Sequence, residues 1–387
     1  YEECYNNTIS ENTANNNGDI GISVHWYTNK IIITRNTVSN NTHIGIELYD
    51  YCSNNTISNN SANNNGERGI DLEYYCKNNT ISNNNINHNG DFGLYLDSNC
   101  DDNIILENTI NNNSYGIRVW ASCDHNKIKE NLLIHNLQYG ICLWGGEDER
   151  ISNKIVENVL YNNYYGVYLD TNSKNNTIYK NFFAKNEKHA IDDGTGNTWN
   201  SSTIGNYWDN HTGPDLSPED GIVDNPYTYI DGFPGNIDYL PIAEDGPPRI
   251  TINSPIEDER FGSTAPTFNV EIIDMYVFEM WYTLDGGVHN HTFTKNGTII
   301  QSVWDTLSSG RVTITFYARD IGGNVAFEKV TVIKSVSAGG LDPGVMTFIV
   351  VISVIGGLAI IGAILGILIK KGKISLEKIK SFSFRKK

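Results

Sequence analysis

The sequence lacks the motifs that assign a chain to several common enzyme classes. It contains no Gly-rich phosphate-binding loop, no Ser/His/Asp order typical of a hydrolase and no Cys/His spacing typical of a zinc site. These absences give no support to nucleotide-dependent, triad-based or zinc-dependent chemistry. The fold and function must therefore be argued from the pattern of the chain itself.

Positive charge is also scarce. The 387 residues contain 28 Lys and Arg against 45 Asp and Glu, which gives a formal net charge of −17. Residues 370–387 carry eight Lys or Arg and one Glu, and residues 345–369 carry no charge, so residues 1–344 carry −24. Such an acidic body argues against nucleic acid as a partner, because the phosphate backbone binds basic surfaces.

A spaced repeat fills the first half of the chain. NNTIS-type segments are followed 11 or 12 residues later by Gly-aliphatic-x-aliphatic, and period-2 apolar pairs between Asn, Gly and Ser are typical of strands and turns. Each unit is too short to enclose a core alone, so the units must stack. The repeat predicts a right-handed parallel β-helix over residues 1–195. Steps of 24, 24, 24, 24, 23, 27 and 23 residues separate Ile9, Ile33, Ile57, Ile81, Ile105, Ile128, Ile155 and Ile178.

An asparagine stands three residues after each of these isoleucines. Stacked in register, the amides can form a hydrogen-bonded ladder along the rod. Asparagine also tolerates the left-handed backbone conformation that a corner needs, so we expect this column to be structural. Its members are Asn12, Asn36, Asn60, Asn84, Asn108, Asn131, Asn158 and Asn181.

Five of the six cysteines share one position, five residues before the aligned isoleucine. Thr28 and Ser173 take this position in two other units, so we expect an inward column of small side chains. Adjacent coils bring the thiols within disulfide reach, but parallel Cβ vectors disfavour the bond. A thiolate column for Cu(I) or another soft metal is the alternative. The five are Cys4, Cys52, Cys76, Cys100 and Cys123.

Two columns of the Gly-aliphatic strands should point outward, because side chains alternate between the faces of a strand. The residues two positions after the glycine are Ser23, Glu47, Asp71, Tyr95, Arg118, Cys142, Tyr168 and Asp192. The residues four positions after it are His25, Tyr49, Glu73, Asp97, Trp120, Trp144 and Asp170.

These columns hold the candidate functional residues. A carboxylate set with a nearby arginine suits acid–base chemistry on a sugar, or calcium binding, and exposed rings suit stacking on sugars. A solvated acidic face with ordinary aromatic ladders is the structural alternative. The candidate catalytic set is Glu47, Asp71, Glu73, Asp97 and Arg118. The candidate glycan-binding rings are Tyr95, Trp120 and Trp144.

Residues 196–245 are rich in Gly, Pro, Asp and aromatic residues, which predicts an irregular cap that closes the rod. Dispersed carboxylates in such a segment are natural ligands for a hard cation. Asp215, Asp220 and Asp224 are therefore a candidate calcium site, with a solvated acidic loop as the alternative. No other cofactor is predicted.

The rest of the chain predicts a second module and an anchor. Alternating segments in residues 246–336, TIIQSVW among them, indicate an immunoglobulin-like β-sandwich of about seven strands. After a linker at 337–344, the apolar run 345–369 is long enough for a transmembrane helix. The basic segment 370–387 follows it, so the positive-inside rule places this tail in the cytoplasm and the acidic body outside.

The repeat and the segment that follows it together resemble a known family. The NNTIS-type coils, the Gly-Ile-x-Leu strands and the closing GNYWDN…DGI…DNPY resemble the NosD-like periplasmic copper-binding β-helix family, one of a wider group of carbohydrate-binding and sugar-hydrolase β-helices. Gly205 to Trp208 match the family's motif, while its acidic run is matched loosely by Asp215, Asp220, Gly221 and Asp224. The second module and the anchor resemble those of archaeal cell-surface proteins.

These patterns predict a membrane-anchored, single-pass cell-surface protein with a structural or adhesive role. Its expected partner is a polysaccharide or a cell-surface glycoprotein. A polysaccharide lyase or glycoside hydrolase that uses the outer acids is one alternative, and a copper-handling accessory protein, implied by the resemblance, is another. The chain begins at Tyr1 within a repeat, and we expect a further segment to cover that end.

Overall fold

The computed structural model describes residues 4–335 except for 212, 217–219, 244–245 and 275–276. The chain divides into two compact units, Tyr1–Pro247 with Ile321–Asn324, and Pro248–Asp320 with the residues from Val325 on. The predicted span 345–369 and the tail 370–387 lie outside the described residues. Within the described part, no helix is long and apolar enough to cross a membrane.

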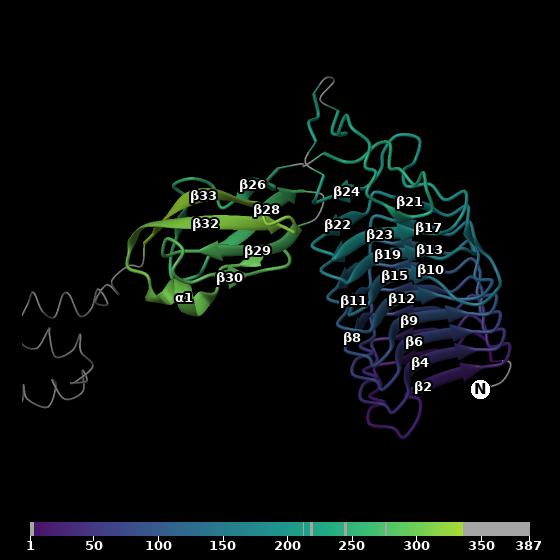
Figure 1. Cartoon of the computed structure of the whole chain (residues 1–387). Coiled ribbons are helices and arrows are strands. Elements are labelled where there is room, and N and C mark those ends of the chain that lie inside the picture. The colour runs from purple at the N-terminus through teal and green to yellow at the C-terminus, as the bar shows by residue number, and fades with distance from the viewer. Residues whose placement is uncertain (1–3, 212, 217–219, 244–245, 275–276, 336–387) are drawn as a thin grey trace, which may run out of the picture. The chain divides into compact units, whose positions relative to one another are not determined.

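The first unit is an all-β parallel solenoid whose coils stack in sequence order (Figure 1). The aligned isoleucines pair with one another in register from Ile9 to Ile178, which confirms the predicted stacking. They form an eight-stranded sheet of β1 (Thr8–Ser10), β3 (Ile32–Thr34), β5 (Thr56–Ser58), β7 (Thr80–Ser82), β10 (Ile104–Leu106), β13 (Lys127–Lys129), β17 (Lys154–Val156) and β21 (Thr177–Tyr179).

Two further sheets complete the coils. The six-stranded sheet contains β8 (Asn85–Asn87), β11 (Thr109–Asn111), β14 (Leu132–Ile134), β18 (Val159–Tyr161), β22 (Phe182–Ala184) and β24 (Tyr207–Trp208). The nine-stranded sheet contains β2 (Ile22–His25), β4 (Ile44–Tyr49), β6 (Arg68–Glu73), β9 (Phe92–Asp97), β12 (Tyr115–Val119), β15 (Tyr139–Leu143), β19 (Tyr165–Leu169), β23 (Lys188–Asp192) and β25 (Asp231–Gly232). A short pair, β16 (Arg150–Ile151) and β20 (Ser173–Lys174), lies beside them.

The predicted asparagine ladder is present and is one of three. In it, Asn84 Oδ1 accepts the backbone N–H and the amide of Asn60, while the Asn84 amide donates to Ile57 O and to Asn108 Oδ1. The ladder continues beyond the repeat to Asn206. A second ladder begins at Asn17 and ends at Asn186, and a third begins at Asn55 and ends at Asn197.

The left-handed residue of this corner is not the ladder asparagine. Positive φ falls one position earlier, where Asn59 and Asn83 stand in two coils and Glu, Arg or Lys stand in the others. The expectation that the ladder asparagines adopt this conformation is therefore wrong. They are held instead by amide hydrogen bonds between coils.

The glycine that precedes each aliphatic pair is required by close approach. A Cβ on Gly69 would lie 2.3 Å from Ile86 Cγ2 and 2.7 Å from the carbonyl oxygen of Gly93 in the next coil. Neither contact leaves room for a methyl group, because real Cβ atoms keep more than about 3 Å from such neighbours. The glycine column therefore fixes how tightly this corner of the solenoid closes.

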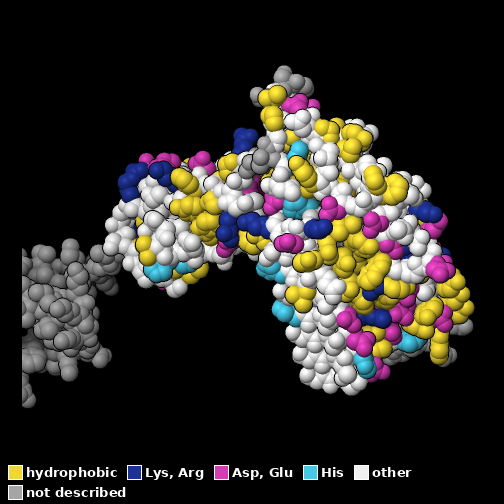
Figure 2. Space-filling view, in the orientation of Figure 1, with side chains coloured by type: hydrophobic (Ala, Val, Ile, Leu, Met, Phe, Trp, Pro, Cys, Tyr) yellow, Lys and Arg dark blue, Asp and Glu magenta, His cyan; other side chains and the backbone are white. Residues whose placement is uncertain are grey.

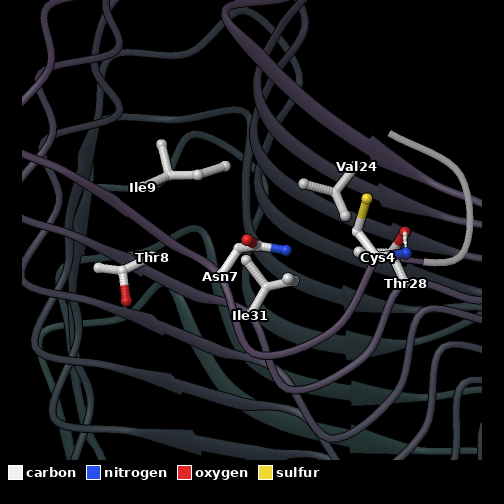
Figure 3. A pocket seen from close by; sticks show the side chains of 7 residues that line it. All are labelled: Cys4, Asn7, Thr8, Ile9, Val24, Thr28 and Ile31. Atoms are coloured by element: carbon white, nitrogen blue, oxygen red, sulfur yellow. Dashed lines mark hydrogen bonds between the residues drawn. The ribbon is translucent and has the colours of Figure 1, made fainter.

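The interior is a continuous column of buried aliphatic side chains, and the Cys52–Cys123 column forms part of it. No disulfide joins these cysteines, and each thiol lies among buried neighbours, which confirms the inward column of small side chains. A pocket at the first two coils is lined by Cys4, Asn7, Thr8, Ile9, Val24, Thr28 and Ile31 (Figure 3). It is lined by no charged residue, and it is the end of the same core.

Large rings cover the last coil. Phe183 stacks on Trp208 with ring centroids 4.4 Å apart, and Tyr227 stacks on the other side of Trp208 at 4.0 Å. Trp208 also carries an indole N–H, which needs a partner because the ring is buried, and its Nε1 donates to the buried carboxylate of Asp238 at 3.0 Å. Burial raises the pKa of Asp238, and the hydrogen bonds that its carboxylate accepts from Asn206, Trp208 and Leu240 act in the opposite direction.

The second unit has two sheets around one core. One sheet contains β26 (Arg249–Ser254), β28 (Thr267–Ile273) and β31 (Gly297–Thr298), and the other contains β27 (Arg260–Phe261), β33 (Val325–Lys334), β32 (Gly310–Asp320), β29 (Val277–Thr283) and β30 (His291–Thr292). The strand predicted for TIIQSVW is wrong beyond Thr298, because α1 (Gln301–Thr306) follows and buries Trp304 in the core.

The ladder yields a prediction for stability. Asn84→Ala should lower the free energy of unfolding by about 3 kcal/mol or more, because it leaves the Asn60 N–H groups and Ile57 O buried without partners. Asn12→Ala, at the same position in an exposed coil, is the control and should cost less than about 1 kcal/mol. Urea denaturation of both variants measures the difference, and equal costs would contradict the role given to burial.

Candidate functional site

The outer face of the nine-stranded sheet brings most of the predicted candidates together. Ser23, Glu47, Asp71, Tyr95, Arg118, Cys142 and Tyr168 lie side by side on consecutive strands, as predicted. Asp192 does not continue this column, because Ile191 pairs with Tyr168 and Asp192 pairs with the inward Leu169. Its buried carboxylate instead accepts a hydrogen bond from Trp199 Nε1 at 2.9 Å.

This column is covered rather than solvated. Glu47, Asp71, Tyr95 and Arg118 are 7%, 0%, 7% and 8% exposed. The cover comes from neighbouring columns, since Arg68 lies over Tyr95 and Phe92 stacks on the same ring at 4.9 Å. The face is therefore a packed layer of charges and rings, and not the solvated acidic surface of the structural alternative.

Arg68 neutralises the centre of the acidic cluster. Its Nη1 donates to Asp71 and to Glu73, one residue in each outward column. Asp71 is fully buried, and its Oδ1 has no hydrogen-bond partner. Burial raises the pKa of the Asp71 carboxyl well above its usual range, against the opposing effect of Arg68. A carboxyl in this state holds its proton at higher pH than an exposed one.

A second polar group adjoins this cluster on β2 and β4. His25 Nε2 lies 2.9 Å from Glu47 Oε2, and the Ser23 hydroxyl contacts both side chains. The arrangement differs from a catalytic triad, because one ring nitrogen meets both partners. On the far side of the cluster, the Tyr95 hydroxyl donates to Asp97 at 3.2 Å.

Arg118 is held by rings and not by the carboxylates expected beside it. Its guanidinium carbon lies 4.0 Å from the ring centroid of Trp120 and 4.6 Å from that of Trp144. Phe92 and Tyr115 complete the surround at 5.0 and 5.4 Å. The two tryptophans predicted to stack on a sugar therefore also flank a buried cation, an arrangement that cation–π attraction stabilises.

A row of rings extends along the sheet from the four rings that surround Arg118, which we call the Arg118 cage. Tyr115, Tyr139 and Tyr165 stand at the start of successive strands, with ring centroids 5.3 and 4.9 Å apart. Trp144 lies 6.3 Å from Tyr139 and is 36% exposed. Figure 2 shows this face, where hydrophobic side chains gather over β12, β15 and β19 and acidic ones gather over β4 and β6. We call Phe92, Tyr115, Trp120, Tyr139, Trp144 and Tyr165 the aromatic platform.

A tyrosine stack that was not predicted from the sequence lies at the edge of the acidic cluster. Tyr27, Tyr51 and Tyr75 stack face to face with centroids 4.9 and 4.8 Å apart, and they are 50%, 40% and 38% exposed. Each has positive φ, which is uncommon for a bulky residue. Their spacing of 24 residues is the repeat length, so counting along the chain would have found them.

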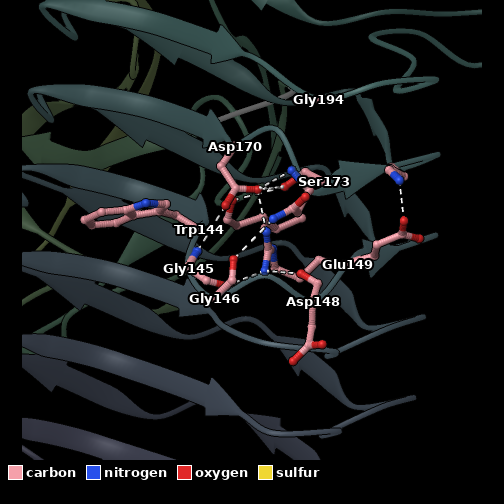
Figure 4. Close-up of polar contacts among 12 residues, drawn as sticks. Trp144, Gly145, Gly146, Asp148, Glu149, Asp170, Ser173 and Gly194 are labelled. Carbon is pink, nitrogen blue, oxygen red and sulfur yellow. Dashed lines mark hydrogen bonds and ion pairs between the residues drawn. The ribbon is translucent and has the colours of Figure 1, made fainter.

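Arg150 was also missed, although it occupies the repeat position of the cysteines. It is fully buried and pairs with Asp170, whose other oxygen accepts the N–H of Gly145 (Figure 4). Arg150 also donates to the carbonyl oxygens of Gly145 and Asp148. Asp170, which was predicted to point outward, is thus only 8% exposed, and its carboxylate holds the loop after Trp144.

Comparisons with known proteins agree with this architecture. Residues 1–133 and 51–160 match the family described as "Right handed beta helix region", and residues 138–213 match the family described as "Periplasmic copper-binding protein (NosD)". The solenoid belongs to the NosD-like right-handed β-helix family. No protein with a curated description is detectably similar to the sequence.

Several solved structures resemble part of the chain. The mannuronan C-5 epimerase AlgE6 A-module of Azotobacter vinelandii is 17% identical, with a TM-score of 0.45 over 50% of this chain and 57% of that chain. The periplasmic alginate epimerase AlgG is 22% identical, with a TM-score of 0.39 over 47% of this chain and 44% of that chain. A tailspike protein of Acinetobacter baumannii bacteriophage Fri1, a capsular polysaccharide depolymerase, is 10% identical, with a TM-score of 0.26 over 82% of this chain and 57% of that chain. The first two matches span about half of those chains.

The described residues of the NosD-like solenoid do not fit a copper centre. Burial raises the pKa of Cys76 and of Cys100, which keeps them as thiols, and their Sγ atoms donate to backbone carbonyls. Nowhere in the described part do three or more His, Cys, Asp or Glu side chains gather as metal ligands. Asp215 and Asp224 accept loop N–H groups, and calcium binding by them stays a prediction.

The buried carboxyl of Asp71 predicts a pH dependence of stability. Because its folded pKa is raised, the native state binds this proton more tightly than the unfolded chain, and stability falls as pH rises through that window. Asp71→Asn carries no such titration, so its melting temperature relative to the natural chain should rise between pH 5 and pH 8. Thermal scans at both values test this, with exposed Asp102→Asn as the charge control. A relative melting temperature that does not change with pH would contradict the assignment.

The Arg150–Asp170 pair yields a second prediction. Arg150→Met should cost about 3–5 kcal/mol of stability, because it leaves a buried carboxylate without its cation. The double variant Arg150→Met with Asp170→Asn should recover part of that loss, since no uncompensated charge remains. Chemical denaturation of the two variants gives the coupling. An equal loss of stability in the single and the double variant would contradict the role given to the ion pair in holding the loop.

Proposed function

We propose that the protein binds a polysaccharide along the outer face of the nine-stranded sheet. The observation that carries the proposal is the aromatic platform, in which stacked rings on successive coils meet a cluster of polar groups on one face. Rings supply flat apolar area for sugar faces, and the adjoining carboxylates and hydroxyls accept and donate hydrogen bonds to sugar hydroxyls. The repeat of the coils suits a ligand that is itself a repeating chain.

Binding is the role that these contacts favour over catalysis. Asp71 is fully buried, and Glu47 and Glu73 are tied to His25 and Arg68. A hydrolase or lyase needs a carboxyl group within hydrogen-bond reach of the bond that it breaks. Cleavage remains the second candidate function because Asp71 combines a raised pKa with neighbouring carboxylates, which is the setting in which a general acid arises.

The remaining features complete the proposal from the sequence. Residues 345–369 would cross a membrane, and the basic segment 370–387 would lie in the cytoplasm, so the solenoid would face the exterior. The second unit, immunoglobulin-like in class, would separate the binding face from the membrane. A cell-surface polymer or the glycan of a surface glycoprotein is the expected partner.

A glycan panel tests the proposal with the full chain in detergent. The natural protein should bind at least one polysaccharide, and Trp144→Ala should weaken that binding by roughly fivefold or more, since removal of a partly exposed ring at a binding face typically costs 1 kcal/mol or more. Tyr239→Ala removes an exposed ring of the cap and serves as the matched control. Affinity electrophoresis on polymers of neutral and acidic sugars gives the comparison.

The same samples separate binding from cleavage. New reducing ends or unsaturated ends in the incubated polysaccharide would establish the second candidate function. The absence of binding to every polymer, or equal binding by the Trp144 and Tyr239 variants and the natural protein, would refute the aromatic platform as the binding face.

A further inference from the structure

We propose that Arg118 is the subsite for an oxyanion, a carboxylate or sulfate group, of an acidic polysaccharide. The inference rests on the proposed binding function and adds the chemical class of the ligand. Its starting point is that Arg118 is 8% exposed and that its side chain donates a single hydrogen bond within the described residues.

A guanidinium carries five N–H donors. The one hydrogen bond that Arg118 donates within the described residues runs from Nε to the carbonyl oxygen of Trp144 at 3.4 Å. Neither terminal nitrogen donates a hydrogen bond within the described residues, and neither is fully enclosed. The terminal nitrogens therefore remain able to donate to a ligand, while the rings of Trp120 and Trp144, 6.4 Å apart, pack against the guanidinium from adjacent sides.

Neighbouring side chains do not neutralise this charge. Tyr95 lies on one side of Arg118 in the column and Cys142 on the other, and both remain neutral, since burial raises the pKa of Tyr95 and raises that of Cys142 to about 12. Arg68 provides the contrast on the same face, because it meets two carboxylates. Burial of a cation without an anion is costly, and a bound oxyanion would offset that cost.

The setting selects an anion that is attached to a sugar ring. Rings hold the guanidinium in one orientation, so its fork is ready for the two oxygens of a carboxylate or sulfate. The exposed part of the aromatic platform, Trp144 above all, lies beside that fork and would contact the sugar that carries the anion. A small free anion would gain nothing from those rings.

The acidic body of the protein does not prevent such binding. Asp71 is two strands from Arg118 in the column, about 10 Å away at the usual strand spacing, and is already paired. At physiological ionic strength the Debye length is about 8 Å, so more distant charges are largely screened. At very low salt the acidic groups of the protein repel an anionic ligand, so its affinity should first rise as salt is added. At higher salt the contact between the anion and Arg118 is screened as well, and the affinity should fall.

The test compares three polymers with the full chain: polygalacturonate, the same polymer with its carboxyl groups reduced, and a sulfated galactan. The natural protein should bind an acidic polymer, and Arg118→Gln should lose at least about tenfold in affinity, the effect of a charge-assisted hydrogen bond. Arg118→Lys should fall between them because it keeps the charge without the fork. Arg35→Gln makes the same charge change at an exposed arginine outside this sheet and should bind like the natural protein.

Each outcome decides the matter. Loss of binding on carboxyl reduction identifies a carboxylate, and preference for the galactan identifies a sulfate. Unchanged binding of an acidic polymer by a folded Arg118→Gln variant overturns the inference. Binding of neutral polymers alone also overturns it while leaving the proposed function in place, and binding of no polymer overturns both.

Discussion

Amide hydrogen bonds between coils are the constraint on which the first unit depends. Each buried ladder asparagine accepts from the coil on one side and donates to the coil on the other, so every amide is satisfied only when the coils are in register. A slip of one residue would leave these groups buried without partners and would turn each outward column inward. The aliphatic core makes stacking favourable, while the amides decide which stacking occurs.

Register of this kind turns a sequence repeat into rows of like side chains on one face of the sheet. Residues 24 positions apart become neighbours, so a row of similar side chains forms from a single repeat position. The tyrosine stack arises in this way, as does the row from Tyr115 to Tyr165. The same geometry brings the acidic side chains close together, and Arg68 reduces the repulsion between Asp71 and Glu73 because it pairs with both.

The repeat spacing was enough to predict the positions of residues that obey it, and it failed where the spacing changes. It placed Ile9 to Ile178, the asparagine ladder and most of the outer columns. Asp192 was misplaced because the last unit has no glycine to mark the register, and alignment on Ala190 shifted it by one residue. The α1 helix was missed because its apolar residues are as compatible with a strand. Burial of the outer column was beyond sequence reasoning, since it depends on which neighbouring side chains fold over it.

The departure from the repeat is also what builds the Arg118 cage. The long step between Ile128 and Ile155 adds the loop after Trp144, which turns at Gly145 with a φ of 126°. This glycine passes so close to Trp120 that a Cβ would lie 2.0 Å from the ring, and its N–H is held by Asp170. Arg150, in a position that cysteine takes in most coils, fixes Asp170 and the Gly145 carbonyl. The buried Arg150–Asp170 ion pair thus fixes the loop that follows Trp144, and Trp144 and Trp120 both contact Arg118. Regular coils build the solenoid, and one irregular coil gives it the cluster of rings around Arg118 on which the proposed ligand site depends.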